Sequence, residues 1–281
     1  MNLDIVISGL ILIAAFYVLL LLGKLINDLL HREYRLNFEL TEKDNAALAL
    51  ATTGYYSGLV LAIGGVLVGP SLSIVDDLID LSIYGLLAIV LVNVSWYVCD
   101  KLILFKFKIS EELIRDHNQG TGAVSAGMSI ASGFIIFGSV QGQGGSVWTV
   151  IVLWAIGQAI LILAGLVYEF VTPYNIHDEI EKDNVAAGVS FAGALVAIGA
   201  IVGLAAESDF ESWAVSLPDY LGYSVLGLAL LPVIRLLTDK VLLPTVKLTD
   251  EIARQDRPNV GAAYIEAFSY IAAAFIIYWC V

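Results

Sequence analysis

Residues 181–206 read EKDNVAAGVSFAGALVAIGAIVGLAA, in which a short polar segment leads into an uncharged stretch from Asn184 to Ala206. A helix needs about 20 predominantly apolar residues to cross the hydrocarbon core of a bilayer, so this stretch is long enough to span one. The whole chain of 281 residues has the same character, with 59% hydrophobic residues, 15% charged residues and a mean hydropathy of +0.85. A soluble globular domain is therefore excluded.

Uncharged stretches of this length recur along the chain, and charged segments separate them. The longest, from Asn118 to Tyr168, is interrupted by the Gly-rich segment 141–146, whose composition is typical of a tight turn, so it predicts two spans. The expected spans cover residues 4–27, 46–69, 81–104, 119–140, 147–170, 184–206, 219–243 and 259–280. The sequence thus predicts an all-α polytopic membrane protein with eight transmembrane helices.

The tetrapeptide at 181–184 also stands at 42–45, and it marks an internal duplication. When the chain is shifted by 139 residues without gaps, 22 of the 98 positions from 42 to 139 are identical. Polar identities such as Asp100 with Asp239 are not explained by apolar composition. We expect two parallel four-helix repeats, at residues 1–141 and 142–281, related by a pseudo-twofold axis along the membrane normal.

A shorter period lies inside each repeat, because every loop on one side of the membrane holds a Glu-Leu or Glu-Ile pair and closes with Asn. These residues are Asn45, Asn118, Asn184 and Asn259. Asp44 and Asp183 precede two of them. Either the Asp or the Asn is expected to cap the following helix, which contributes ~1 kcal/mol. The unit is therefore a two-helix hairpin that is used four times.

Lysine and arginine predict the orientation of these hairpins. Of the 14 cationic residues, 13 fall in or beside the four loops that close with Asn, and Arg235 lies near the same end of its span. Cytoplasmic loops carry an excess of Lys and Arg, so we expect these loops in the cytoplasm and both termini on the periplasmic side. The charged residues of the loops on the other side of the membrane are all acidic. This pattern and the net charge of −13 speak against nucleic acid as a partner and favour the attraction of cations.

Two loops of the second half carry a family resemblance. They read Asp178-Glu179-Ile180-Glu181-Lys182-Asp183-Asn184-Val185-Ala186-Ala187-Gly188 and Asp256-Arg257-Pro258-Asn259-Val260-Gly261-Ala262-Ala263. In these residues the chain resembles the YjfL-like bacterial membrane proteins, which are built from copies of domain of unknown function 350. The resemblance covers nearly the whole chain as four two-helix copies, and it is looser at Asn118-Gln119-Gly120-Thr121, where no Arg-Pro precedes the Asn. It implies a multi-pass protein of the bacterial inner (plasma) membrane, with no activity or site assigned.

A second acid stands ten to twelve residues before each Glu of the loop motif, at the end of the helix that enters the loop. These acids are Asp28, Asp100, Glu169 and Asp239. The helix macrodipole disfavours a negative charge there by about 0.3–1 kcal/mol, so something must offset it. Local partners such as Lys101 and Lys240 are one explanation. The other is a set of four related carboxylates around a cytoplasmic mouth, which would concentrate cations as charged rings do in cation channels.

Glu266 is the one acid well inside a span, and the shift of 139 residues pairs it with Gly127. An ionisable group at that depth costs at least ~2.5 kcal/mol unless it is paired, protonated or hydrated. Arg235 on the preceding span is its candidate partner. The pair is either part of a cation path or a structural ion pair that locks the last two spans together.

Two functions follow from these residues. The first is passage or binding of a small cation or cationic solute, with Asp100 and Asp239 at the mouth and Glu266 with Arg235 deeper inside. The alternative is a non-conducting membrane scaffold that anchors a cytoplasmic protein partner in a response to envelope stress. No nucleophile, metal-ligand spacing or cofactor motif stands out in the sequence, so we expect no enzyme, no catalytic residue, no metal and no cofactor.

The lipid bilayer is the first expected partner, and a second copy of the chain is the next. Small residues share one face of the second span, at Gly54, Gly58 and Gly65, and one face of the sixth, at Gly188, Ala192, Gly199 and Gly203. Small residues let helices approach closely, so these faces predict close helix contacts and offer a route to a homodimer.

Overall fold

The computed structural model describes residues 3–69 and 73–280, which form helices and short loops. Eight of the described helices are long and apolar enough to cross a membrane. They are α1 (Leu3–Leu30), α3 (Ala46–Val68), α4 (Ile74–Val98), α6 (Gln119–Gln141), α7 (Val147–Val171), α9 (Val185–Ala206), α10 (Trp213–Leu237) and α12 (Val260–Cys280). Four short helices lie in the loops between them: α2 (Leu36–Thr41), α5 (Ile109–Ile114), α8 (Ile176–Glu181) and α11 (Leu248–Ala253). The predicted all-α protein with eight spans is confirmed.

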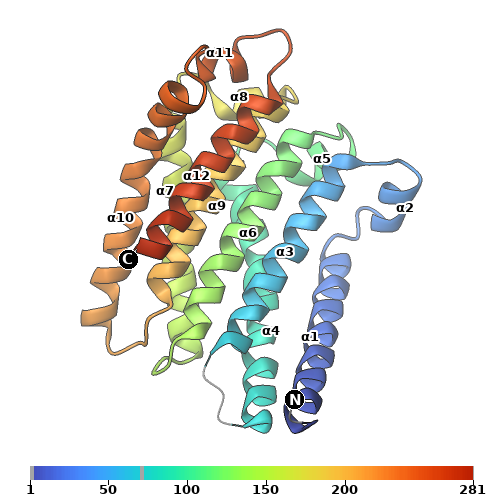
Figure 1. Ribbon diagram of the computed structural model, residues 1–281. Coiled ribbons are helices and arrows are strands. Elements are labelled where there is room, and N and C mark those ends of the chain that lie inside the picture. The colour runs from blue at the N-terminus through green and yellow to red at the C-terminus, as the bar shows by residue number, and fades with distance from the viewer. Residues whose placement is uncertain (1–2, 70–72, 281) are drawn as a thin grey trace.

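The helices that follow the Asn residues form one row, in the order α3, α6, α9 and α12 (Figure 1). The helices α4, α7 and α10 each pack against two successive members of this row, and α1 packs on α4 and α3. We call the end of the bundle that carries the Asn residues and the short helices the basic end. The opposite end, where α3 ends and the connections 142–146 and 207–212 lie, is the acidic end.

Glycine explains why the row is tight. At each junction between neighbouring row helices, one helix presents a Gly where a Cβ would collide with the Cα of an Ala on the next helix. These pairs are Gly54 with Ala126, Gly127 with Ala192, and Gly193 with Ala267. Without a side chain between them, the two backbones come into direct contact. The same contact is therefore made three times along the row.

The expected pseudo-twofold axis is wrong. A twofold axis would require the fourth unit to contact the first unit in the same way that the second contacts the third. The row helices of those two units, α12 and α3, instead lie at opposite ends of the row (Figure 1). The first half is related to the second by a displacement of two units along the row. The contact between the halves is therefore head-to-tail. The glycine faces are also occupied within the chain, since Gly58 meets Ser129 and Gly203 meets Phe134. They are not free to join a second copy.

The third and seventh spans begin earlier than expected from the sequence. The helices α4 and α10 start at Ile74 and Trp213, so Asp80 and Asp219 lie in their second turns and not in loops. The Ser73 side chain caps α4, and acids near a helix N-terminus are stabilised by the macrodipole. Both helices then continue at the basic end as single π-helical turns, η1 (Cys99–Ile103) and η2 (Thr238–Leu242).

Candidate functional site

Each Asn of the repeat motif caps its own row helix. The Oδ1 atom of Asn45 accepts a hydrogen bond from the Leu48 N–H at 3.0 Å, and the other three Asn residues accept the equivalent bond. Asn is therefore the cap. The preceding Asp44 and Asp183 adopt positive φ angles of 50° and 59°, which turn the chain into the helix.

The side-chain amide of the first three Asn residues also reaches the next unit. Asn118 Nδ2 donates to the Ile180 carbonyl at 2.6 Å and to Glu112 of its own unit at 2.8 Å. Corresponding bonds join Asn45 to Leu113 and Asn184 to Ile252. Asn259, in the last unit, donates to Glu251. The repeated motif thus holds neighbouring units together at the basic end.

The four acids at the helix ends each have a partner in their own unit. Asp28 pairs with Lys24 at 2.6 Å, and Glu169 lies 3.0 Å from His177 Nδ1. The other two occupy the π-helical turns, where they accept backbone N–H groups that open the next short helix. Asp100 accepts from Ile109 at 2.9 Å and Asp239 from Leu248 at 2.8 Å, with Lys101 and Lys240 beside them.

The four acids do not gather into one tight cluster. In the described ranges 3–69 and 73–280, no three Asp, Glu, His or Cys side chains lie close enough together to hold a metal ion. The four acids also stand at the ends of successive helices beside the row, each bound to its own neighbours. Local pairing therefore offsets the cost of a negative charge at these helix ends.

Glu266 and Arg235 are brought together, as the sequence predicted. Glu266 is fully buried and forms a hydrogen-bonded ion pair with Arg235. Tyr270 donates to the same carboxylate oxygen at 3.1 Å. The guanidinium carbon lies 6.0 Å and 5.9 Å from the ring centroids of Tyr168 and Tyr174, at the edge of cation–π range. These five residues form one cluster, which joins α7, α10 and α12 near the basic end.

Tyr174 closes this cluster from the loop after α7. Burial raises its pKa to about 12, with the nearby Glu266 carboxylate as a second cause, so its hydroxyl is neutral at physiological pH. Tyr174 therefore adds no charge of its own to the ion pair between Arg235 and Glu266.

The Asn caps correct the expected counterpart of Glu266. Counting seven residues from Asn259 reaches Glu266, and the same count from Asn118 reaches Ser125. The ungapped shift had paired Glu266 with Gly127, because the loop before α12 is two residues longer than the loop before α6. The equivalent positions in the other row helices are Thr52 and Phe191. Only the last unit carries an acid there.

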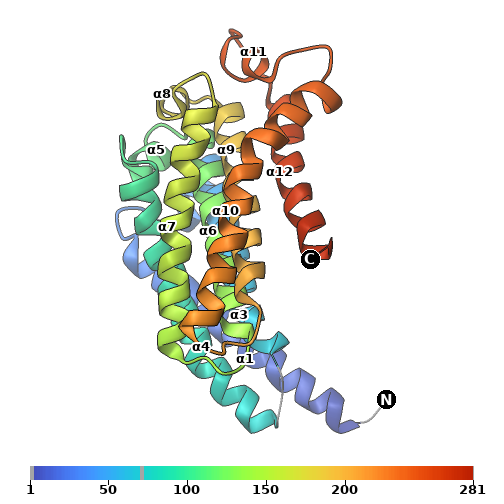
Figure 2. The same ribbon diagram turned by 90° about the vertical axis from the view of Figure 1, so that its left-hand side faces the viewer.

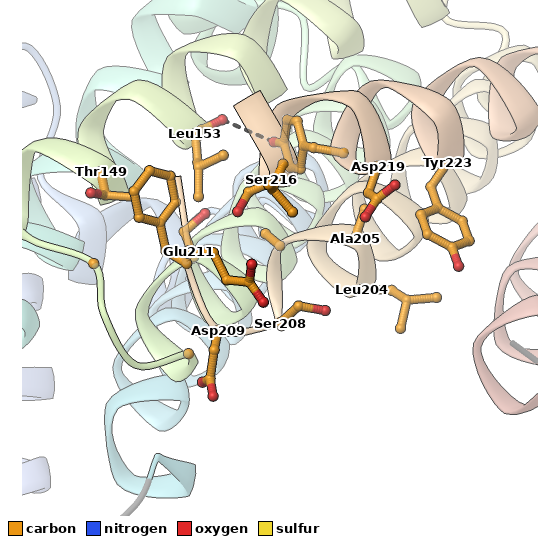
Figure 3. Close-up of a pocket in the computed structure, with 17 residues that line it drawn as sticks. Thr149, Leu153, Leu204, Ala205, Ser208, Asp209, Glu211, Ser216, Asp219 and Tyr223 are labelled. Carbon is orange, nitrogen blue, oxygen red and sulfur yellow. Dashed lines mark hydrogen bonds between the residues drawn. The ribbon is translucent and has the colours of Figure 1, made fainter. Parts of the chain in front are cut away.

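The acidic end holds a pocket of about 380 Å³ between the α6–α7 turn and the start of α10. Figure 3 shows the carboxylates of Asp209, Glu211 and Asp219 around it, with Tyr223 at its side. None of the residues that line it is Lys or Arg. Tyr220 also lines the pocket, and its hydroxyl donates to the Leu153 carbonyl at 2.9 Å. We call this cavity the acidic pocket.

A second cavity of about 430 Å³ lies one junction earlier in the row. It is lined by Asp77, Asp80 and Tyr84. Asp80 and Tyr84 are the counterparts of Asp219 and Tyr223 under the shift of 139 residues. Sequence reasoning noted the acids at this end but missed the cavities, although the repeated Asp and Tyr spacing marks both of them.

Comparison with known proteins gives one family and one relative. The family model described as Domain of Unknown Function (DUF350) matches residues 1–140 and 144–281, so that two copies cover nearly the whole chain. A "UPF0719 transmembrane protein" of Aquifex aeolicus (strain VF5) is 26% identical over 271 residues, which cover 94% of this chain and 96% of that protein. No solved structure matches.

Proposed function

The chain belongs to the family described as Domain of Unknown Function (DUF350), and from that premise we propose that this multi-pass membrane protein binds a small cationic solute at the acidic end of its helix row. The site is the acidic pocket. The observation that carries the proposal is a cavity in which three carboxylates gather with no cationic side chain to neutralise them.

The chemistry of the lining favours an organic cation over a bare metal ion. The three acids do not converge tightly enough to hold a metal, within the described residues, and the volume falls in the range of about 300–1,000 Å³ typical of small-molecule sites. Phe210 and Tyr223 add aromatic faces, and a cation over such a ring gains about 0.5–1 kcal/mol at exposed sites. A concave site lined by one sign of charge also raises the local concentration of the opposite ion.

Passage of the solute would be a second step, and it requires Tyr220 to move. Its ring is packed so closely that a Cβ on Gly157 would lie 2.9 Å from its hydroxyl oxygen. Next to Gly157 on α7, Gln158 donates to Ser132 at 3.2 Å. The positions of lysine and arginine favour the periplasmic side for the acidic end and for both termini, and in that orientation solute would enter from outside.

Binding of choline to the full-length protein in nanodiscs tests the proposal, with 3,3-dimethylbutanol as the uncharged analogue of the same shape. Trp213 contacts Phe210 of the pocket, with 4.9 Å between ring centroids, so tryptophan fluorescence reports occupancy. We expect choline to bind at least ~5-fold more tightly than the alcohol, and Asp219→Asn to remove most of that preference. Asp256→Asn, at the basic end, is the matched control. Equal binding of both probes, or an unchanged preference in Asp219→Asn, contradicts the proposal.

A second candidate function is a scaffold that anchors a cytoplasmic protein at the basic end. One observation favours it. In the described structure the Asn259 amide donates only within its own unit, whereas the amides of Asn45, Asn118 and Asn184 each donate to a carbonyl of the next unit. Crosslinking followed by co-purification tests this function. A scaffold must retain a specific partner that is lost when residues 251–259 are replaced, and no such partner should remain bound to the variant.

A further inference from the structure

A groove of about 190 Å³ lies between α6, α9 and α12 toward the acidic end. Its walls are apolar, from Phe134 on α6, Leu204 on α9 and Phe275 on α12. Its outer end carries two polar groups, the Glu207 carboxylate and the Tyr278 hydroxyl. The groove adjoins the acidic pocket. Leu204 lines both cavities, whereas Glu207 and Tyr278 line the groove alone.

Leu204 explains why the groove exists at this junction. Twenty residues after the Asn cap, α3 has Gly65 and α6 has Gly138, and each of these glycines packs on the backbone of the next row helix. The corresponding residue of α9 is Leu204, which lines the groove together with Tyr278. Two bulky side chains stand where the earlier junctions have a glycine, so α12 is held away from α9. Figure 2 shows the C-terminal half of α12 diverging from α10.

Glu207 stands at an electrostatically unfavourable position without a cationic partner. It is the C-cap of α9, where the macrodipole disfavours a negative charge. Tyr278 donates to it at 3.2 Å, and in the described part of the chain it makes no ion pair. Burial raises the pKa of its carboxyl group. A cation beside this carboxylate would offset both the dipole and the burial.

We propose that this groove binds one acyl chain of phosphatidylethanolamine, whose primary ammonium group pairs with Glu207. The helices here are surrounded by lipid, so a chain that leaves the bilayer to fill the groove loses no apolar contact. A primary ammonium group donates hydrogen bonds to a carboxylate. The trimethylammonium group of phosphatidylcholine has no N–H, and phosphatidylglycerol carries only negative charge.

The experiment is native mass spectrometry of the full-length protein with the three phospholipids, matched in their acyl chains. The wild-type protein is expected to bind phosphatidylethanolamine at least ~5-fold more tightly than the other two lipids, the gain of about one charge-assisted hydrogen bond. Glu207→Gln should retain a bound lipid but lose the preference for ethanolamine. Glu33→Gln is the matched control, because Glu33 is exposed at the basic end and lines neither the groove nor the acidic pocket.

Two further arms separate the groove from the head group. Leu204→Gly, which restores the residue type of the earlier junctions, should let α12 close on α9 and lower the retention of all three lipids, while the melting temperature reports that the chain still folds. Water-soluble glycerophosphoethanolamine should not compete at equal concentration. The proposal is overturned by equal binding of the three lipids to wild type, by a preference that persists in Glu207→Gln, or by competition from the free head group.

Discussion

The Asn118 side chain joins two units of the row through a single amide group. Its Oδ1 atom caps α6 by accepting from the Thr121 N–H at 2.9 Å, and its Nδ2 atom donates to the Ile180 carbonyl of the next unit at 2.6 Å. One residue therefore fixes both the start of a helix and the position of its neighbour, which no shorter polar side chain could do.

Replacing Asn118 by alanine should cost about 1.5–2.5 kcal/mol of unfolding free energy, because it removes both a helix cap and the hydrogen bond to the Ile180 carbonyl of the next unit. The chain supplies its own control. Asn259→Ala removes a cap but no contact with a further unit, so its cost should be about 1 kcal/mol. Unfolding in mixed micelles with increasing SDS measures both. Equal losses would mean that the contact to Ile180 adds nothing.

Gly138→Ala should destabilise the protein by about 1–3 kcal/mol or more, because the added methyl group would overlap the Gly203 backbone at the junction of α6 and α9. Gly222→Ala on α10 is the comparison, since no atom stands within 4 Å of its Cβ position. Alanine is the better helix former, so that variant should be neutral or slightly more stable. Thermal melts of both variants in one detergent test this prediction. Similar melting temperatures would show that the row helices are less tightly packed than in the structure.

The number of spans follows from the sequence because the information is local. An uncharged stretch of sufficient length specifies a span by itself. The starts of α4 and α10 were misplaced for the same reason, since Asp80 and Asp219 interrupt the apolar run although both lie on helices. The duplication was also evident in the sequence, but the similarity of two halves does not reveal the symmetry operation that relates them in space. That operation depends on which faces of α6 and α9 hold glycine, and both helices hold it on more than one face.

The sequence predicted a contact in the site only where one charged residue required a partner of opposite charge. The cost of burying Glu266 alone required a cation nearby, and Arg235 was the available one. Asp100 and Asp239 instead accept backbone N–H groups nine residues further along, which no side-chain pattern displays. The cavities of the acidic end depend on how helices diverge, so the sequence showed their acids but not their walls.

Two neighbouring acids on α5 should respond to pH with opposite sign. Burial raises the pKa of Glu112, so its favourable contribution is full below the ordinary carboxyl value of 4.5 and is lost as pH rises through the higher folded value. The hydrogen bond from Lys108 lowers the pKa of Glu111, whose contribution is present at neutral pH and is lost as pH falls through the lower folded value.

Melting temperatures of the wild type, Glu112→Gln and Glu111→Gln test this contrast across a pH series. Glu112→Gln should gain stability relative to wild type as the pH rises from about 4 to about 7. Glu111→Gln should show a smaller change in the other direction, because that side chain is exposed and solvent screens its ion pair. Parallel curves for the two variants would show that burial does not set the titration of Glu112.

Arg235 and Glu266 allow structure and function to be separated in one double-mutant cycle. Breaking a buried ion pair leaves one charge uncompensated, so Arg235→Met and Glu266→Leu should each cost about 3–5 kcal/mol. The double variant replaces the pair by apolar side chains of similar size, and it should recover most of that loss. Chemical unfolding of the four proteins measures the coupling, and a double variant as unstable as the sum of the single changes would contradict a direct pair.

The recovered double variant then tests the pair's role. If it binds choline as wild type does, and also moves it as wild type does in flux assays, the pair only locks α10 to α12. If it binds choline normally but no longer moves it, the pair belongs to the path of the solute.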